Sequence, residues 1–346
     1  MNRQAVFNWL KQRPWLIVPV LGIVPLIGIP LINQTSSTPE TATVSPSPLL
    51  PTASITLPTI AQSPLSTPQP SPKASPQPAQ KSAQPAQVGN VQAVQSAINL
   101  SVDAAIQMRV LIHEAASRLS VGTSTGGAVF DVQSNRVLYE LPANSSYEMQ
   151  ADGNTILLGA LKLPSLIWID PSPTGVTFVG DRGYRGRILV ATSENRIWVV
   201  NYVNLQQYLY SVVGSEVSPS WPMEALKAQA VAARSYALTY HLKPVKKDLY
   251  DLGSDEYYQV YKGISTEANS TRRAVNTTSG EFVSYRGGVV ESLYAATDDI
   301  VMEAFQGRGM SQIGALGLAE QGQNYRQILS AYYAGTGIGR IEMDIE

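Results

Sequence analysis

The stretch that decides the fold lies within residues 204–241 and contains Asn204-Leu-Gln-Gln-Tyr-Leu-Tyr-Ser-Val-Val-Gly-Ser-Glu-Val-Ser-Pro-Ser-Trp-Pro-Met-Glu-Ala-Leu-Lys-Ala-Gln-Ala-Val-Ala-Ala-Arg-Ser-Tyr-Ala237. Apolar side chains recur in its first part every three or four residues, as on one face of a helix, at Leu205, Tyr208, Leu209, Val212 and Val213. Asn204 is placed to cap this helix and Gly214 to end it. The alanine-rich run that follows predicts a second helix over residues 222–241, with Pro222 at its first position.

The short connection between these two helices contains one acidic residue, Glu216, two residues beyond the predicted helix end. A carboxyl group on a loop that is fixed at both ends is well placed to act as an acid catalyst. Tyr210 and Trp221 are close in sequence, and an aromatic wall would raise the pKa of the carboxyl group by desolvating its charged form. The alternative is an ordinary, solvated loop glutamate.

Strand patterns occupy the chain before residue 203. Residues 128–132 and 137–139 flank a Gln-Ser-Asn-Arg turn, and residues 187–192 and 197–201 flank a Ser-Glu-Asn-Arg turn. Both patterns predict β-hairpins. Residues 91–119 are predicted to be helical or mixed, as a helical neck or as part of a linker. The sequence therefore predicts an α+β fold, a hairpin-rich antiparallel sheet plus helices, and leaves open whether these form one domain or two lobes around a cleft.

The N-terminal residues predict a membrane anchor. Residues 14–32 are uncharged and almost wholly apolar, and at about 1.5 Å per helical residue they are just long enough to cross a bilayer. The charged residues before them are all basic, which predicts a cytoplasmic tail at residues 1–13 and an extracytoplasmic C-terminal part, in the periplasm or cell wall. The alternatives are a buried core helix and a cleaved signal peptide. We expect an uncleaved single-pass anchor in the inner or plasma membrane.

A linker is predicted at residues 33–90, which are rich in Pro, Ser and Thr and have too little apolar surface to fold. The globular domain then occupies residues 91–346. An anchor followed by a long spacer holds a domain away from the membrane, which suggests a target such as a cell wall.

The overall composition excludes several classes of protein. The chain has 25 Lys and Arg residues against 26 Asp and Glu, whereas a nucleic-acid-binding domain normally carries a basic excess. It has no cysteine, which removes disulfides, thiol catalysis and cysteine-rich metal sites. Its two histidines, His113 and His241, are too few for a histidine-rich metal site. We therefore expect no nucleic-acid partner, no metal and no cofactor.

The central stretch resembles the signature of the SpoIID/LytB family, which contains stage II sporulation protein D and amidase-enhancer proteins. The resemblance covers roughly residues 108–340 and includes, besides residues 212–237, Tyr184-Arg-Gly-Arg187, Asn201-Tyr-Val-Asn-Leu205, Tyr261-Lys-Gly263, Thr278-Ser-Gly280, Gly307-Arg-Gly-Met-Ser-Gln-Ile-Gly-Ala315 and residues 325–335. The chain departs from many members in its short interval at residues 295–306, which lacks a histidine before Gly-Met-Ser-Gln. Some members bind zinc through Cys and His, and because the chain has no Cys, neither a metal nor that histidine is carried over.

The resemblance implies a peptidoglycan lytic transglycosylase that acts on glycan strands without stem peptides, with Glu216 as its catalytic residue. Such an enzyme cleaves the bond between N-acetylmuramic acid and N-acetylglucosamine and leaves a 1,6-anhydro sugar. One glutamate can first donate a proton and then remove one. The LytB side of the family supports an alternative, a non-catalytic wall-binding module that enhances a partner amidase. A scaffold that tethers the membrane to the wall is a third reading.

Further residues are candidates for substrate binding, each with a structural alternative. They are Trp221, Gln229, Arg234, Tyr257, Tyr258, Tyr261, Arg308, Ser311 and Gln312. Arg234 either contacts the lactyl group of a muramic acid or pairs with a structural acid. The three tyrosines either line a sugar groove or pack in the core. Arg308, Ser311 and Gln312 lie at a glycine-rich turn that opens a helix, where they either close the cleft or, for Ser311, cap the helix.

Overall fold

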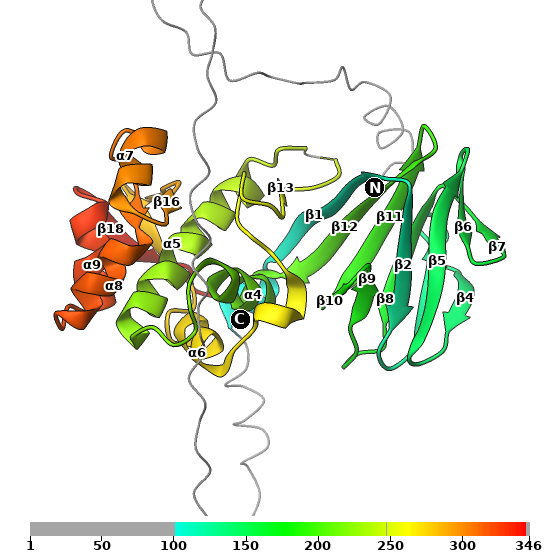
Figure 1. Ribbon diagram of the computed structural model, residues 1–346, viewed down its shortest axis with the longest axis horizontal. Coiled ribbons are helices and arrows are strands. Elements are labelled where there is room, and N and C mark those ends of the chain that lie inside the picture. The colour runs from blue at the N-terminus through cyan, green and yellow to red at the C-terminus, as the bar shows by residue number, and fades with distance from the viewer. Residues whose placement is uncertain (1–100, 247, 344–346) are drawn as a thin grey trace, which may run out of the picture. The chain divides into compact units, whose positions relative to one another are not determined.

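The computed structural model describes residues 101–246 and 248–343 (Figure 1). The predicted cytoplasmic tail, membrane anchor and linker, at residues 1–13, 14–32 and 33–90, lie outside the described residues, as does the start of the predicted domain. Within the described part of the chain, no helix combines the length and the apolar character needed to cross a membrane.

Residues 107–204, which we call the β-rich region, form two sheets, the first of which also takes in the later strand β13. The first has the strand order β13-β1-β12-β11-β8-β3-β4. Its strands are β1 (Gln107–Ala116), β3 (Gly127–Asp131), β4 (Val137–Leu141), β8 (Leu166–Pro171), β11 (Arg187–Ser193), β12 (Arg196–Asn204) and β13 (Leu252–Gly253). Neighbouring strands in this sheet are antiparallel except β1 and β13, which are parallel. Since β13 follows the long helix α5 (Met223–Leu242) in the chain, it connects the helical part of the chain to the sheet.

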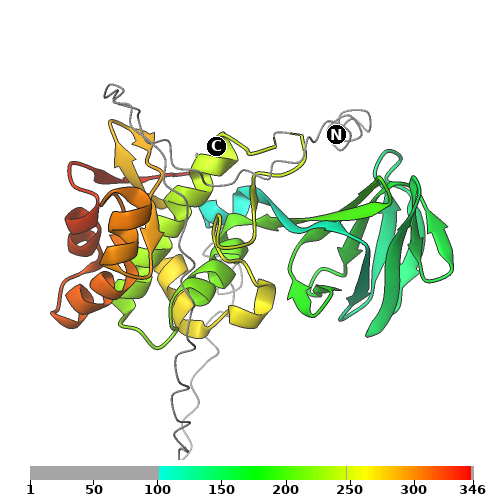
Figure 2. The ribbon, with the colours of Figure 1, turned by 45° about the horizontal axis from the view of Figure 1, so that its top comes forward.

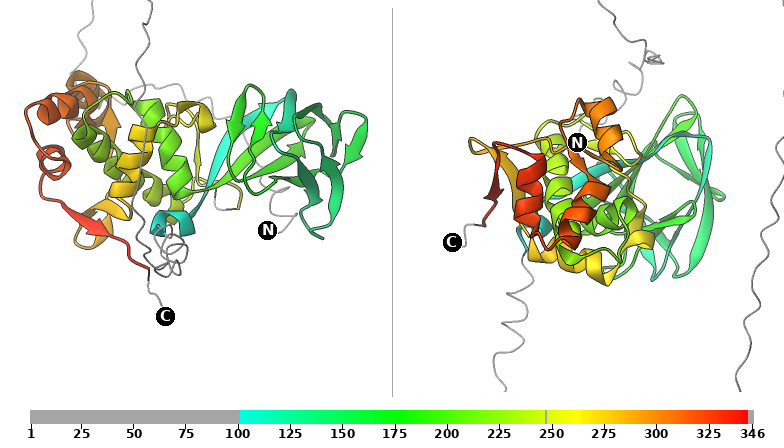
Figure 3. Two further views of the ribbon diagram at one scale, coloured as in Figure 1. Left: turned by 90° about the horizontal axis from the view of Figure 1, so that it is seen from below. Right: turned by 60° about the vertical axis from the view of Figure 1, so that its left-hand side comes forward.

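The second sheet has the order β10-β9-β2-β5-β6-β7 and is antiparallel throughout. Its strands are β2 (Arg118–Thr123), β5 (Ser145–Asp152), β6 (Thr155–Leu158), β7 (Leu161–Leu163), β9 (Thr177–Val179) and β10 (Arg182–Tyr184). Buried side chains of both sheets, such as Val129 and Met149, belong to one core, so the sheets form two facing layers (Figure 3). This burial explains the alternation of apolar and polar residues along the strands.

Two hairpins occur where the sequence predicts them. In the β3–β4 hairpin, Asn135 has a φ of 52°, and in the β11–β12 hairpin, Glu194 and Asn195 have φ angles of 50° and 57°. Two successive residues with positive φ are the mark of a type I′ turn, whose twist matches that of paired strands. The prediction of an α+β fold with hairpin-rich antiparallel sheets is confirmed.

Residues 91–119 were predicted to be helical or mixed, and the described part of this segment, from residue 101, is mixed. It contains one short helix, α3 (Val102–Ala105), followed by β1 and the start of β2. The reading of residues 107–119 as a helical neck or linker is wrong, because β1 pairs with β12 from Gln107 to Ala116. Met108 and Val110 are fully buried in the main hydrophobic core, and this tertiary burial decides the local structure.

Residues 205–343, which we call the helical region, contain α4 (Leu205–Glu216), α5 (Met223–Leu242), the 3₁₀ helix η1 (Gly263–Thr266), α6 (Asn269–Thr277), α7 (Asp298–Phe305), α8 (Gln312–Glu320) and α9 (Tyr325–Tyr332). Short strands complete it as β14 (Glu281–Tyr285), β15 (Gly288–Val289), β16 (Tyr294–Ala295), β17 (Met310–Ser311) and β18 (Gly337–Arg340). Helix α5 is the centre of this region and contacts α4, α6, α8, α9 and β14 (Figure 2).

The two predicted helices are present, with one correction at the end of the first. Asn204 caps α4 by accepting a hydrogen bond from the Gln207 N–H at 2.8 Å. Gly214 does not end the helix, which continues to Glu216. A Cβ atom at position 214 would lie 1.9 Å from the carbonyl oxygen of Thr266. The glycine is therefore needed for the close approach of η1 to α4 and not for a helix stop.

Candidate active site

Glu216 is the last residue of α4, at the start of the connection to α5. The prediction that it lies two residues past the helix end is wrong, because α4 continues beyond Gly214 and includes Glu216. Because the helix dipole places partial negative charge at a C-terminus, this position disfavours a carboxylate and favours the protonated acid.

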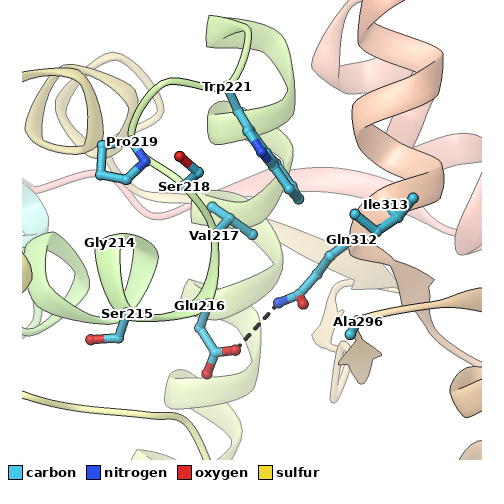
Figure 4. A pocket seen from close by; sticks show the side chains of 10 residues that line it. All are labelled: Gly214, Ser215, Glu216, Val217, Ser218, Pro219, Trp221, Ala296, Gln312 and Ile313. Atoms are coloured by element: carbon cyan, nitrogen blue, oxygen red, sulfur yellow. Dashed lines mark hydrogen bonds between the residues drawn. The ribbon is translucent and has the colours of Figure 1, made fainter. Parts of the chain in front are cut away.

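Neutral donors hold both oxygens of the Glu216 side chain. The backbone N–H of Val260 donates to Oε1 at 2.8 Å, and Nε2 of Gln312 donates to Oε2 at 3.3 Å (Figure 4). Among the described residues, no Lys or Arg forms an ion pair with Glu216. The carboxyl group is thus oriented without being locked in its charged form.

Burial raises the pKa of Glu216 above its usual value. The Val260 N–H, the Gln312 amide and the charge of Lys262 act in the opposite direction and offset the effect of burial only in part. A raised pKa is what a carboxyl group needs in order to serve as a general acid near neutral pH.

Glu216 lines a cavity of about 400 Å³ (Figure 4). The lining residues are Gly214, Ser215, Glu216, Val217, Ser218, Pro219, Trp221, Ala296, Gln312 and Ile313. The volume lies within the range of about 300–1,000 Å³ that is typical of ligand pockets. All of these residues belong to the helical region, so the cavity is not a cleft between the β-rich and the helical regions. Glu216 is the single ionisable group in its lining.

Three of the predicted site residues, Glu216, Trp221 and Gln312, meet at this cavity. Gln312 is the first residue of α8, and Ser311 before it caps that helix by accepting a hydrogen bond from the Gly314 N–H at 3.0 Å. Ser311 is fully buried, which agrees with its structural reading. Arg308 is exposed and does not line the cavity.

Arg234 does not face the cavity, and direct contact with a sugar is inconsistent with its position. Its side chain is 0% exposed and forms an ion pair with Asp103, with Nη2 2.9 Å from Oδ2. The structural reading of this arginine is therefore the correct one. Gln229, one turn earlier on α5, is 1% exposed and does not line the cavity either.

The tyrosines divide into two groups. Tyr261 is 2% exposed, and its hydroxyl donates to Oδ1 of Asn201 at 2.7 Å, so of its two readings core packing is correct and the sugar groove is wrong. Tyr257 and Tyr258 are exposed and half-buried, respectively, and do not line the cavity. Tyr210, the predicted wall of the Glu216 site, instead donates its hydroxyl to Asn276 at 2.7 Å.

The sequence did not predict three groups of the site, which are the Val260 N–H and the cavity residues Ala296 and Ile313. A backbone donor leaves no trace in residue type, and Val260 lies 44 residues from Glu216 in the chain. The Ile313 N–H donates to the Ala296 carbonyl oxygen at 3.1 Å, which joins two segments that have no common sequence pattern. The described residues contain no group of three or more His, Cys, Asp and Glu side chains that could hold a metal ion.

The fold and the site define an α+β protein with one partly buried acid in the lining of a cavity of ligand size. Residues 193–285 match the profile of the SpoIID family, described as stage II sporulation protein. The chain is 40% identical over 113 residues to an uncharacterised protein of Brachyspira hyodysenteriae, which is 33% of this chain and 31% of that protein. It is 35% identical over 96 residues to the protein named amidase enhancer of Bacillus subtilis, which is 28% of this chain and 12% of that protein.

The segment at residues 193–285 is therefore similar to the SpoIID family, and part of the chain is similar to an amidase enhancer. It matches less than one third of the length of either relative. The profile match includes Glu216 and Val260 but ends before Gln312.

Proposed function

We propose that the chain is a membrane-anchored lytic transglycosylase that cleaves the bond between N-acetylmuramic acid and N-acetylglucosamine in peptidoglycan strands without stem peptides. The observation that carries this proposal is the position of Glu216, an acid with a raised pKa, held by neutral donors at the wall of a cavity of about 400 Å³. The similarity of residues 193–285 to the SpoIID family, which is linked to cell-wall processing, and the partial similarity to an amidase enhancer support the choice of substrate.

The single acid in the cavity lining favours a lyase over a hydrolase. Hydrolytic glycosidases generally use two carboxyl groups, one as the acid and the other as a nucleophile or as a base that activates water. A lytic transglycosylase needs no second carboxyl group, because a hydroxyl group of the substrate is the nucleophile. The lining of this cavity supplies one acid, and its other polar side chains are neutral.

In the proposed reaction, Glu216 performs both proton transfers. Its protonated carboxyl group donates a proton to the bridging oxygen as the bond from that oxygen to C1 of the muramic acid breaks. The C6 hydroxyl of the same muramic acid then attacks C1, and the Glu216 carboxylate takes up the hydroxyl proton. The products are a strand with a free 4-hydroxyl and a strand with a 1,6-anhydro end. No water is consumed, and Glu216 returns to its starting form.

The test is to incubate the full chain with glycan strands lacking stem peptides and to identify the products by mass spectrometry. We expect 1,6-anhydro ends, and a loss of rate of about 10²–10⁴-fold in Glu216→Gln, the usual contribution of a general acid–base group. Glu303→Gln, on an exposed position of α7, is the matched control and should cleave at the wild-type rate. Cleavage by Glu216→Gln at the wild-type rate would refute the mechanism.

A second candidate function is supported by the name of the Bacillus subtilis relative, amidase enhancer. In this reading the domain binds the wall without cleaving glycan and increases the activity of a partner amidase. The transglycosylase and the enhancer are distinguished by repeating the glycan assay in the presence of a purified cell-wall amidase. Binding without anhydro products, together with faster release of stem peptides by the amidase, would establish the enhancer and exclude the transglycosylase.

The anchor is part of the proposal. Residues 14–32 would hold the chain in the inner or plasma membrane, and residues 33–90 would let the domain reach the wall. Membrane fractionation tests this by comparing the full chain with a chain that lacks residues 1–32. The full chain should sediment with membranes, and the truncated chain should be soluble.

A further inference from the structure

Five tyrosines form a continuous row of ring contacts, which we call the tyrosine row. The ring centroids of Tyr257 and Tyr258 are 6.5 Å apart, those of Tyr258 and Tyr240 5.8 Å, those of Tyr240 and Tyr236 4.9 Å, and those of Tyr236 and Tyr294 6.4 Å. These distances are typical of aromatic pairs that pack against one another. The row brings together side chains from α5, from β16 and from the segment that follows β13.

The inner end of the tyrosine row lies beside Glu216. Nε2 of Gln259 donates to the Tyr294 hydroxyl at 2.9 Å, and the next residue, Val260, donates its N–H to Glu216. Burial and then the nearby charge of Glu216 raise the pKa of Tyr294, which agrees with their proximity. The segment that carries Tyr257 and Tyr258 is therefore the same segment that holds the catalytic acid.

The outer end of the tyrosine row is open to solvent. Tyr257 is 83% exposed, and Tyr258 and Tyr240 are half-buried. The Tyr240 hydroxyl donates to Glu291 at 3.0 Å, which fixes that ring. Core packing accounts for Tyr236, which is 6% exposed, whereas the ring of Tyr257 is open to solvent and extends the exposed faces of Tyr258 and Tyr240 into a larger aromatic surface.

We propose that Tyr240, Tyr257 and Tyr258 form a second carbohydrate-binding surface that holds glycan units beyond the Glu216 cavity. The apolar C–H faces of a pyranose ring can pack on exposed aromatic rings and remove apolar area from water. Tyr257 precedes Val260 by three residues, so their Cα atoms are at most about 10 Å apart, and one glycan strand can reach both sites. The surface deepens the proposed function and rests on it for the identity of the polymer.

The charges around this surface select among sugars. Asp255 and Glu256 directly precede Tyr257 and are exposed, and Glu291 is exposed beside Tyr240. These acids repel a sugar that carries a carboxylate, such as a muramic acid with a free lactyl group. The surface therefore favours the uncharged N-acetylglucosamine units, which alternate with the muramic acid units along the proposed strand, as the rings that pack on the tyrosines.

The test is calorimetric titration of the full chain with a neutral probe, the hexamer of N-acetylglucosamine. We expect Tyr257→Ala to weaken binding about two- to tenfold, the range that one aromatic contact contributes. Tyr257→Trp should bind as well as the wild type or better, because it keeps a large aromatic face. Tyr285→Ala is the matched control, since Tyr285 is 51% exposed on β14 and lies outside the tyrosine row, and its affinity should be unchanged.

Equal affinity of Tyr257→Ala and the wild type, or no binding of the hexamer by the wild type, would overturn the surface. The assay is independent of cleavage, so the two proposals can fail separately. Weaker binding by Tyr257→Ala in a chain that cleaves no glycan would support the surface and exclude the transglycosylase. Cleavage of glycan without any effect of Tyr257→Ala on binding would leave the transglycosylase and exclude the surface.

Discussion

The β-rich region and the helical region differ in how far the side chains of their ion pairs are exposed to solvent. In the β-rich region, Arg118 and Glu148 form an ion pair whose side chains are 61% and 53% exposed. In the helical region, Arg234 and its partner Asp103 from α3 are both 0% exposed. Exposed pairs contribute little to stability because water solvates both partners well, whereas a buried charge that loses its partner is left without solvation. The helical region therefore depends on the completeness of its polar contacts.

Glu216 differs from the acids of the described residues whose side chains are buried and paired. Asp103 pairs with Arg234, Asp251 with Arg109, Glu267 with Arg185 and Arg272, and Glu281 with Arg326. Glu216 has only the neutral donors of Val260 and Gln312. Among the residues that the structure describes, no arginine forms an ion pair with Glu216, and burial raises the pKa of this acid. The difference separates structural acids from the candidate catalyst.

The strongest test of this comparison removes one member of the buried pair. We expect Arg234→Met to lower the free energy of unfolding by about 3–5 kcal/mol, because Asp103 is left buried without a partner. Chemical denaturation measures this loss. In the double variant Arg234→Met/Asp103→Leu, both charges are absent and much of the stability should return. A double variant as unstable as the single one would show that the arginine matters for packing and not for its charge.

The second test concerns the close approach of η1 to α4. Gly214→Ala places a methyl group 1.9 Å from the Thr266 carbonyl oxygen, and we expect a loss of about 1–3 kcal/mol together with reduced glycan cleavage, because the end of α4 carries Glu216. Gly317→Ala is the matched control in the interior of α8, where a Cβ meets nothing within 4 Å, and it should stabilise the protein by about 0.4–1 kcal/mol. Thermal unfolding of both variants measures the difference. Equal stability of the two variants would contradict the steric reading of Gly214.

The sequence predicted those features that depend on local pattern. The helix from Leu205, its Asn204 cap and the two hairpins follow from spacing and turn residues, and all are present. Glu216 and Trp221 were found because the same short connection carries both, and Gln312 because it lies in a recognisable motif. These residues meet at one cavity.

Contacts between distant segments could not be predicted from local pattern. Gly214 was misread because a glycine can end a helix or permit a close contact, and the Thr266 carbonyl that decides between them is 52 residues away. Arg234 and Tyr261 were each left with two readings, substrate binding or a structural role, because residue type alone does not reveal burial, and both are buried. The Val260 N–H was missed because backbone donors are the same in every residue except proline.

The third test uses pH to separate Glu216 from the paired acids. Its pKa is raised in the folded protein, so the folded state binds more protons than the unfolded state between the ordinary and the raised pKa values. The contribution of Glu216 to the free energy of unfolding is therefore greatest below its ordinary pKa and is lost as the pH rises through its raised pKa. We expect Glu216→Gln to unfold at a higher temperature than the wild type at neutral pH and to lose this advantage in acid. If Glu216→Gln and the wild type unfold at the same temperature at neutral pH, the raised pKa of Glu216 is contradicted.

The same reasoning gives Gln312 a role as a positioning residue. Its amide donates to Oε2 of Glu216 and lowers the pKa of the acid, against the larger effect of burial. In Gln312→Leu the donor is gone, so the pKa of Glu216 should rise further. Because the active acid is the protonated form, the alkaline limb of the profile of kcat/KM against pH should move to higher pH. Gln312→Glu would add a like charge beside Glu216 and move the alkaline limb in the same direction. If Gln312→Leu loses activity without any movement of the limb, the role of the glutamine is merely structural.

The smallest expected effect lies in the β-rich region and completes the comparison. Arg118 pairs with Glu148 at 3.1 Å across neighbouring strands β2 and β5, in a position open to solvent. Side-chain entropy and hydration nearly cancel the attraction of such a pair, so Arg118→Ala should change the free energy of unfolding by less than about 1 kcal/mol. Raising the salt concentration should reduce even that difference, because exposed charges are screened. A loss comparable to that of Arg234→Met would mean that the two regions use their charged side chains in the same way, and that exposure does not separate structural charges from solvated ones in this protein.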